Sequence, residues 1–276
     1  MSKTLILGCG YVGLALARLL KERGEAVTGW VHRPESARAL EEAGIAAWTG
    51  DLADPEAWRG LPADFAAVVH CAATRGGGPE AYRRVYLEGM RRALAHLPHA
   101  RPVMVSSTSV YGQNDGAWVA EDSPAAPAAA TSQILLEAEA EALRRPGAVI
   151  LRAAGIYGPG RGALLEKFRA GTAAIEGDGT RWINQIHRDD LAAALALPLP
   201  GGVYNAADDA PVTYLDYYGW LAHRLGKPMP PHVPPNPGRK RGLTNKRVSN
   251  ARLRAAGWAP RHPTFREGLD ALLKDA

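Results

Sequence analysis

The chain has 276 residues, 46% of them hydrophobic and 22% charged, which is enough for one substantial core or for a nucleotide-type domain with a small appendage. Its 33 basic and 28 acidic residues give a formal net charge of +5, and its two cysteines are too few for a disulfide framework. No apolar run reaches the roughly 18 residues of a membrane span, and the first residues show no secretory cleavage site. We therefore expect a globular cytoplasmic protein that neither contacts a membrane nor binds a metal.

Short apolar runs alternate with amphipathic segments through the first half of the chain, a pattern typical of an α/β protein with a parallel sheet. We predict helices at residues 12–24, 34–44, 80–97 and 132–144, and strands at 5–7, 26–31, 45–49, 65–70, 103–105 and 148–152. The predicted fold is a Rossmann-type, doubly wound parallel sheet of at least six strands over residues 1–155. Residues 156–276 are expected to form mainly a smaller C-terminal substrate-binding lobe, with some segments returning to the first domain.

The first apolar run leads into Gly8-Cys9-Gly10-Tyr11-Val12-Gly13, which fits the pattern G-x-G-x-x-G with a strand directly before it and a helix directly after it. Gly8 permits the tight turn, Gly10 lets the backbone approach a pyrophosphate, and Gly13 lets the helix pack close to the strand. The helix N-terminus offers unpaired N–H groups to the anion. The loop, including Tyr11 and Val12, therefore predicts dinucleotide binding.

The end of the second strand indicates which nicotinamide cofactor is bound. An acidic residue there would bind the ribose hydroxyls of NAD and repel a 2′-phosphate, but the sequence reads Trp30-Val31-His32-Arg33. The planar guanidinium of Arg33 is suited to a 2′-phosphate. We predict NADP as the cofactor, with NAD as the alternative if Arg33 is simply a solvated residue at a strand end.

The C-terminal part of the chain is irregular and basic. Six prolines between residues 228 and 237 indicate an extended connector. Eleven basic and no acidic residues lie between Arg224 and Arg266, so the remainder carries 22 basic against 28 acidic residues, a balance of −6. This section could hold a phosphate-bearing ligand or a nucleic acid, or it could be solvated. Because it lacks zinc-finger spacing, basic-zipper heptads and an RNA-binding signature, we do not expect nucleic acid.

Six further short sequence motifs follow the glycine loop. They are Gly50-Asp51-Leu52, His70-Cys71-Ala72-Ala73, Val105-Ser106-Ser107-Thr108-Ser109-Val110-Tyr111-Gly112, Leu151-Arg152 through Gly155-Ile156-Tyr157-Gly158-Pro159-Gly160-Arg161, Ile186-His187-Arg188-Asp189-Asp190-Leu191 and Val203-Tyr204-Asn205-Ala206. In content and order they resemble the extended short-chain dehydrogenase/reductases of the NAD-dependent epimerase/dehydratase type. The resemblance covers essentially the whole chain.

The resemblance implies roles for individual residues. Asp51 and Leu52 would meet the adenine, and Cys71, Ala72 and Ala73 would lie along the cofactor. Ser107 holds the position of the family's catalytic Ser or Thr and, with Thr108, would contact the substrate hydroxyl. The residues expected to reach the rest of the substrate, which could be a nucleotide sugar, are Arg161, Arg181 and Asn184. For Tyr111, His187, Asp190 and Cys71 the structural interpretation is preferred to a catalytic one.

One departure from the family is large. Its redox members carry Tyr-x-x-x-Lys on the helix before the sixth strand, where Tyr is the acid/base and Lys lowers its pKa and binds the nicotinamide ribose. Matching Glu139 to the family's glutamate places Thr131 at the Tyr position and Leu135 at the Lys position. Because a threonine hydroxyl is far too weak an acid to replace that phenol, the chain is identified as an atypical member.

Three interpretations remain open at this point. The first is an NAD(P)-dependent oxidoreductase, epimerase or dehydratase that acts on a small-molecule substrate, with an unidentified acid/base. The second is a catalytically silent protein that senses NADP(H) and acts through a partner. The third, nucleic-acid binding, rests on charge alone. A homodimer is compatible with each of the first two.

Overall fold

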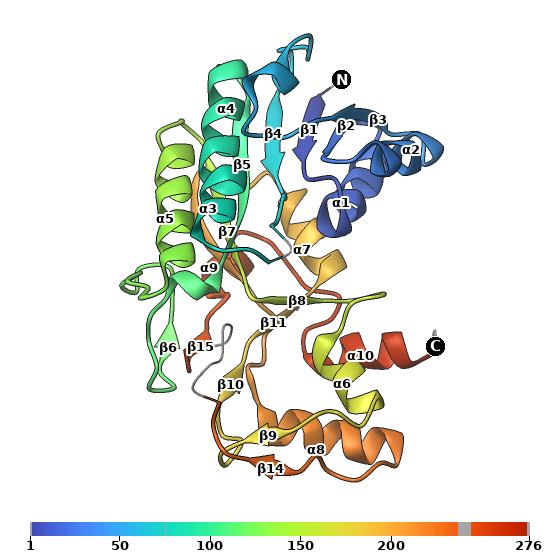
Figure 1. Cartoon of the computed structure of the whole chain (residues 1–276), viewed down its shortest axis with the longest axis vertical. Coiled ribbons are helices and arrows are strands. Elements are labelled where there is room, and N and C mark those ends of the chain that lie inside the picture. Colours follow the sequence, from blue (N-terminus) through green and yellow to red (C-terminus); the bar gives the residue numbers. More distant parts are fainter. Residues whose placement is uncertain (1, 75, 237–243, 275–276) are drawn as a thin grey trace.

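A seven-stranded, all-parallel sheet forms the centre of the computed structural model, which describes residues 2–74, 76–236 and 244–274 (Figure 1). The strand order is β12-β7-β5-β4-β1-β2-β3. Six strands of this sheet precede residue 155 and confirm the prediction: β1 (Lys3–Leu7), β2 (Ala26–Val31), β3 (Ala46–Thr49), β4 (Ala67–His70), β5 (Arg101–Ser107) and β7 (Val149–Ala153). The seventh strand, β12 (Gly202–Ala206), comes from the second half of the chain and pairs with β7.

Helices cover both faces of this sheet, so the doubly wound arrangement is confirmed (Figure 1). On one face lie α1 (Tyr11–Glu22), α2 (Pro34–Glu42) and α7 (Arg188–Leu195). On the other lie α5 (Ala130–Leu143) and a continuous helix made of α3 (Pro79–Tyr82), a π-helical segment (Arg83–Glu88) and α4 (Gly89–His96). Each helix buries one apolar stripe, as Leu16, Leu40 and Leu191 illustrate for the first face. None of the helices in the described ranges combines the length and apolar character needed to cross a membrane.

A buried polar network ties α5 to the sheet. Arg152 of β7 donates from Nη2 to Oε2 of Glu139 at 2.7 Å, and the two side chains are only 8% and 3% exposed. Arg152 also donates to the hydroxyl of Tyr111 at 3.0 Å, and that hydroxyl donates to Oδ1 of Asn205 in β12 at 2.8 Å. The Tyr111 phenol is therefore engaged in the interior, in line with its structural interpretation.

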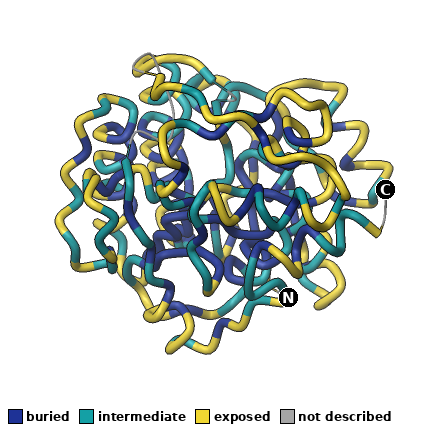
Figure 2. The backbone as a smooth tube through the Cα atoms, turned by 90° about the horizontal axis from the view of Figure 1, so that it is seen from below, coloured by how far each residue is buried: buried dark blue, intermediate teal, exposed yellow. Residues whose placement is uncertain are grey.

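A second, smaller lobe is built from later parts of the chain (Figure 1). Its elements are α6 (Ala163–Arg169), β9 (Ile175–Glu176), β10 (Trp182–Ile183), β13 (Val212–Thr213), α8 (Tyr214–Leu225), β14 (His232–Val233) and α10 (Phe265–Lys274). They share a core that includes Phe168, Tyr217 and Phe265. The parallel pair of β8 (Gly155–Tyr157) and β11 (Gln185–His187) lies between this lobe and the large sheet. Seen from below, the exposed residues follow the outer turns of the chain (Figure 2).

Part of the proline-rich segment forms a strand. β14 pairs in parallel with β9, so residues 232–233 belong to a small two-stranded sheet of the second lobe rather than to a bare connector. A proline cannot donate a ladder hydrogen bond, which restricts such a segment to short or edge strands. The last of the six prolines, Pro237, lies outside the described residues.

Two basic residues of this section have partners in other parts of the chain. Arg224 pairs with Asp270 at 2.7 Å, and the guanidinium of Arg247 stacks between Trp118 and Trp182 at 5.2 and 5.1 Å from their ring centres. Three of the basic residues, Arg239, Lys240 and Arg241, lie outside the described part of the chain.

Candidate functional site

The three glycines of the loop between β1 and α1 have different surroundings. A Cβ on Gly8, whose φ is +79°, would lie 2.2 Å from Cα of Ala72, and one on Gly13 would lie 2.6 Å from the carbonyl oxygen of Gly8. A Cβ on Gly10 would meet none of the described atoms within 4 Å. Gly8 and Gly13 are therefore required by the packing of the protein itself, whereas Gly10 borders open space.

The loop leaves the N-terminus of α1 open to a ligand. Gly8 and Cys9 both donate their N–H groups to the carbonyl of Trp30 at 2.9 Å, which fixes the loop against β2. Gly10 is the N-cap and has no side chain to accept bonds from the first turn, so the N–H groups of Tyr11 and Val12 have no acceptor within the helix. Such a helix end attracts phosphate. The residues present therefore fit the pyrophosphate of a dinucleotide.

The ring of Tyr11, in the glycine loop, contacts two arginines from later in the chain. The guanidinium carbons of Arg161 and Arg188 each lie 5.2 Å from the centre of its ring. Its buried hydroxyl has no hydrogen-bond partner among the described residues, and burial raises its pKa. Arg188 also forms an ion pair with Asp189 at 2.7 Å. Arg161 thus lies beside the predicted cofactor loop, and its contact with a substrate stays a prediction.

The residues predicted to meet the adenosine half of the cofactor follow β2 and β3. Arg33 is exposed at the N-cap of α2. The carboxylate of Asp51 accepts hydrogen bonds from the N–H of Ala53 and from Nε of Arg84, both at 2.9 Å. Although burial acts to raise it, the pKa of Asp51 is lowered overall because these two groups stabilise the charged form. Leu52 is buried in the core.

The residues after β4 pass against the glycine loop. Ala72 is the residue that a Cβ on Gly8 would strike, and the N–H of Cys71 donates to the carbonyl of Leu7 at 2.8 Å. Burial raises the pKa of Cys71 well above its ordinary value and that of Cys9 to about 12. Neither thiol is a ready nucleophile, which agrees with their interpretation as packing residues. Ala73 is exposed at the same strand end.

Three serine hydroxyls gather at the carboxyl end of β5, the edge of a parallel sheet at which ligands bind. Oγ of Ser107 accepts the N–H of Ser109 at 3.1 Å, which closes a turn over Thr108–Val110. Ser132, in the first turn of α5, donates its hydroxyl to Oγ of Ser109 at 2.9 Å. The sequence singled out Ser107 and Thr108 but missed Ser132, although it directly follows Thr131.

The α5 helix explains why the family's usual acid/base pair cannot act here. Leu135, at the Lys position, is 3% exposed and packs in the core with Leu87 and Ile134. Thr131, at the Tyr position, is half-buried. An apolar side chain at the Lys position can neither bind the nicotinamide ribose nor lower the pKa of a neighbour. The Tyr-x-x-x-Lys pair of the family's redox members is therefore not present in α5.

Arg181 and Asn184 have contacts within the protein. Nδ2 of Asn184 donates to the carbonyl of Lys246 at 2.9 Å, and its Oδ1 accepts the N–H of Val248 at 2.7 Å. The guanidinium of Arg181 lies 5.7 Å from the ring centre of Tyr214 in α8. Asn184 thus anchors the segment that enters β15 (Arg247–Val248), and the half-buried Arg181 packs against Tyr214 of the second lobe. Their contacts with a substrate stay predictions.

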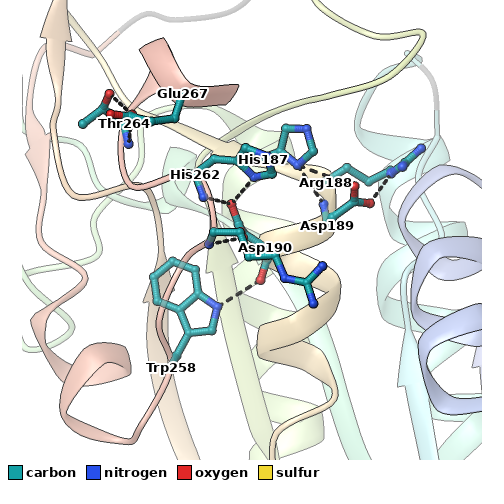
Figure 3. Close-up of polar contacts among 9 residues, drawn as sticks. His187, Arg188, Asp189, Asp190, Trp258, His262, Thr264 and Glu267 are labelled. Atoms are coloured by element: carbon teal, nitrogen blue, oxygen red, sulfur yellow. Dashed lines mark hydrogen bonds and ion pairs between the residues drawn. The ribbon is translucent and has the colours of Figure 1, made fainter. Parts of the chain in front are cut away.

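His187 and Asp190 belong to a compact cluster with His262 (Figure 3). Asp190 accepts hydrogen bonds from the N–H groups of Arg261 and His262 at 2.7 and 3.1 Å, and lies 2.9 Å from Nδ1 of His262. Its backbone carbonyl accepts the indole N–H of Trp258 at 3.0 Å. The carboxylate is therefore saturated by the segment that leads into α10.

The imidazole of His187 completes this cluster. Its Nδ1 accepts the N–H of Asp189 at 3.2 Å, which caps α7, and its ring centre lies 3.9 Å from that of His262. Burial and the neighbouring His262 lower the pKa of His187 to about 4, so the ring is neutral at pH 7. The cluster joins α7 to the C-terminal segment, which supports a structural role. Sequence analysis missed His262 because it lies 72 residues from its partner Asp190.

Comparisons with known proteins place this geometry in context. A family model described as the NAD dependent epimerase/dehydratase family matches residues 4–206. Protein YeeZ of Escherichia coli (strain K12) is 33% identical over 245 residues, which cover 83% of this chain and 86% of that protein. A 2-alkyl-3-oxoalkanoate reductase of Stenotrophomonas maltophilia is 33% identical over 211 residues, covering 68% of this chain and 62% of that protein.

A solved structure is similar over the whole chain. The crystal structure of human epimerase family protein SDR39U1 with NADPH superposes with a TM-score of 0.81 at 25% sequence identity, covering 99% of this chain and 100% of that one. The seven-stranded sheet and the glycine loop are thus set in a fold that carries a nicotinamide dinucleotide in a related protein.

Proposed function

Because the chain belongs to the NAD-dependent epimerase/dehydratase family, we propose that it is an NADP(H)-dependent oxidoreductase acting on a hydroxyl or carbonyl substrate. The glycine loop carries this proposal, since Gly10 borders open space at a helix end without a side-chain cap. The NADPH in the human relative supports a nicotinamide dinucleotide as the cofactor. When bound, the nicotinamide gives or takes a hydride at its C4.

One group of residues in this chain would bind the cofactor, and another would bind the substrate. Gly10, Tyr11 and Val12 would hold the pyrophosphate, and Arg33 would bind the 2′-phosphate. Ser107 and Thr108, at the carboxyl end of β5, would orient the reacting oxygen of the substrate. The division into residues 1–155 for the cofactor and 156–276 mainly for the substrate belongs to the same proposal. Nucleotide sugars are the first substrate class to test, and 3-oxo acids are the second because a reductase of such substrates is among the relatives.

Calorimetric titration of nucleotide-stripped protein with NADPH and with NADH tests the cofactor proposal. We expect tight binding of NADPH and much weaker binding of NADH. A panel of nucleotide sugars and 3-oxo acids is then screened for oxidation of NADPH. Failure of both nucleotides to bind would mean that the glycine loop has only a structural role, and the oxidoreductase proposal would be abandoned.

Replacing Arg33 with alanine is expected to weaken NADPH binding about 10- to 100-fold and to leave NADH binding nearly unchanged. A hydrogen bond to a charged group contributes roughly 1.5–3 kcal/mol, and each 1.4 kcal/mol is tenfold in affinity. The same titrations on Arg18→Ala, which removes an exposed arginine from the middle of α1, provide the control. Equal losses of NADPH and NADH affinity in Arg33→Ala would refute the 2′-phosphate role.

A second candidate function is a silent NADP(H) sensor, which the burial of Leu135 at the family's Lys position favours. The two candidates differ in turnover. A sensor would bind NADPH tightly and leave it unoxidised with every substrate of the panel, whereas the oxidoreductase would consume it with at least one.

A further inference from the structure

Asn245, two residues ahead of β15, is hydrogen-bonded to two different parts of the fold. The main-chain carbonyl of Asn245 accepts the N–H of Gly116 at 2.9 Å, next to β6 (Trp118–Val119), with which β15 pairs. Its side-chain Oδ1 accepts the N–H of Trp182 in β10 at 2.9 Å. Lys246, the next residue, therefore lies between β6, whose Val119 packs in the core of the large lobe, and β10 of the second lobe. Ligand sites occur preferentially at such junctions.

The side chain of Lys246 is buried at this junction without a counter-charge. The residue is 5% exposed, and its Nζ donates to the main-chain carbonyl of Tyr111 at 3.1 Å and to the hydroxyl of Thr244. No ion pair between described residues includes it, in contrast to Lys3, which pairs with Asp64 at 2.7 Å. A buried ammonium without a carboxylate is costly for folding, and such groups concentrate at functional sites.

Through its contact with Tyr111 the ammonium is bonded to the segment that follows the carboxyl end of β5. Tyr111 directly follows the turn of Thr108–Val110, which begins at Ser107. Nζ of Lys246 is thus hydrogen-bonded to a residue of the short segment that begins at Ser107, at the carboxyl end of β5. Parallel sheets bind their ligands at that end.

The cations near Lys246 are engaged with other groups. Arg247 stacks between Trp118 and Trp182, and Arg152, which donates to the hydroxyl of Tyr111, is paired with Glu139. Burial lowers the pKa of Lys246 to about 8. A group that titrates near the working pH is best suited to general acid/base catalysis.

We propose that Lys246 is the acid/base residue of this protein and takes over the role that Tyr-x-x-x-Lys has in the redox members of the family. The inference rests on the oxidoreductase function proposed above. During reduction of a carbonyl, the hydride bonds to the carbonyl carbon, the π electron pair moves to the oxygen, and the ammonium gives that oxygen a proton. The neutral amine then takes a proton from water. In the oxidative direction the neutral amine removes the hydroxyl proton as the hydride leaves.

The protonation state of Lys246 can be measured without a substrate. The chain has seven lysines, so the ¹³Cε signals of ¹³C-lysine-labelled protein saturated with NADP⁺ can be followed over pH and assigned with Lys246→Arg. We expect the Lys246 signal to titrate near pH 8, below the ordinary lysine pKa of about 10.4. Titration of Lys246 at the ordinary lysine pKa would overturn this inference and leave NADPH binding untouched. Absence of NADPH binding would instead overturn the proposed function and this inference with it.

Turnover provides a second test. In Lys246→Met we expect NADPH binding to be retained and carbonyl reduction to fall about 10²- to 10⁴-fold. In Lys246→Ala, whose short side chain leaves room for a free amine, added methylamine should restore part of the activity. Since reduction uses the ammonium, the wild-type rate should fall as the pH rises through about 8, and that dependence should disappear in Lys246→Met. The matched control is Lys21→Met, because Nζ of Lys21 also donates to main-chain carbonyls, those of Ala43 and Gly44, but at the surface. Unchanged reduction in Lys246→Met, or a loss that methylamine does not restore in Lys246→Ala and that leaves the pH dependence in place, would refute the catalytic role.

Discussion

Replacing Gly8 with alanine is expected to destabilise the protein by about 2–4 kcal/mol and to prevent cofactor binding. The new Cβ would lie 2.2 Å from Cα and 2.4 Å from the backbone nitrogen of Ala72, so main chain would have to move. Overpacking of this kind costs typically 1–3 kcal/mol, and alanine at a positive φ such as +79° adds about 1 kcal/mol. Urea unfolding and calorimetry with NADPH on the same sample measure both effects.

Gly10→Ala is the matched comparison because the two glycines are two residues apart in one loop. A Cβ on Gly10 has no described atom within 4 Å, so we expect the free energy of unfolding to change by no more than about 1 kcal/mol. The same Cβ would stand where the pyrophosphate approaches, and we expect at least a 100-fold loss of NADPH affinity. If Gly10→Ala bound NADPH like the wild type, the pyrophosphate would not lie at this helix end.

The second large effect is expected from Arg152→Leu, which should lower the free energy of unfolding by about 3–5 kcal/mol. Removal of one partner leaves Glu139, whose side chain is 3% exposed, as an uncompensated buried charge. It also removes a donor from the hydroxyl of Tyr111. The measurement is the midpoint and slope of urea unfolding compared with the wild type.

Two controls separate the buried charge from the loss of packing. The double variant Arg152→Leu, Glu139→Leu should recover part of the lost stability, because no buried charge remains. Arg83→Leu breaks the pair of Arg83 with Glu137, whose side chains are 48% and 45% exposed, and should change stability by no more than about 1 kcal/mol. Equal losses in Arg83→Leu and Arg152→Leu would contradict the argument.

The sequence predicts those parts of the fold that are determined by local sequence patterns. The glycine loop, the six strands before residue 155 and the helices between them follow from apolar periodicity and glycine position, which act over a few residues. Local patterns sufficed because each of these elements packs one continuous apolar stripe or run.

The parts that sequence did not predict depend on contacts between distant segments. Lys246 reaches a carbonyl 135 residues earlier in the chain, and nothing in its own neighbourhood separates it from the ten other basic residues of the C-terminal section. The pairing of His262 with Asp190 and the stacking of Arg161 on Tyr11 have the same origin. Such contacts are set by the path of the chain between the lobes, which periodicity does not encode.

The position of β12 also constrains the order in which the protein can fold. This strand is hydrogen-bonded to β7, all five residues of which are buried, yet it lies about fifty residues further along the chain. Until it has left the ribosome, β7 is an open edge strand, and such edges pair readily with other chains. The large lobe therefore closes only after much of the second lobe has been synthesised. A fragment that ends at residue 155 would keep β7 as an open edge strand, which pairs readily with other chains.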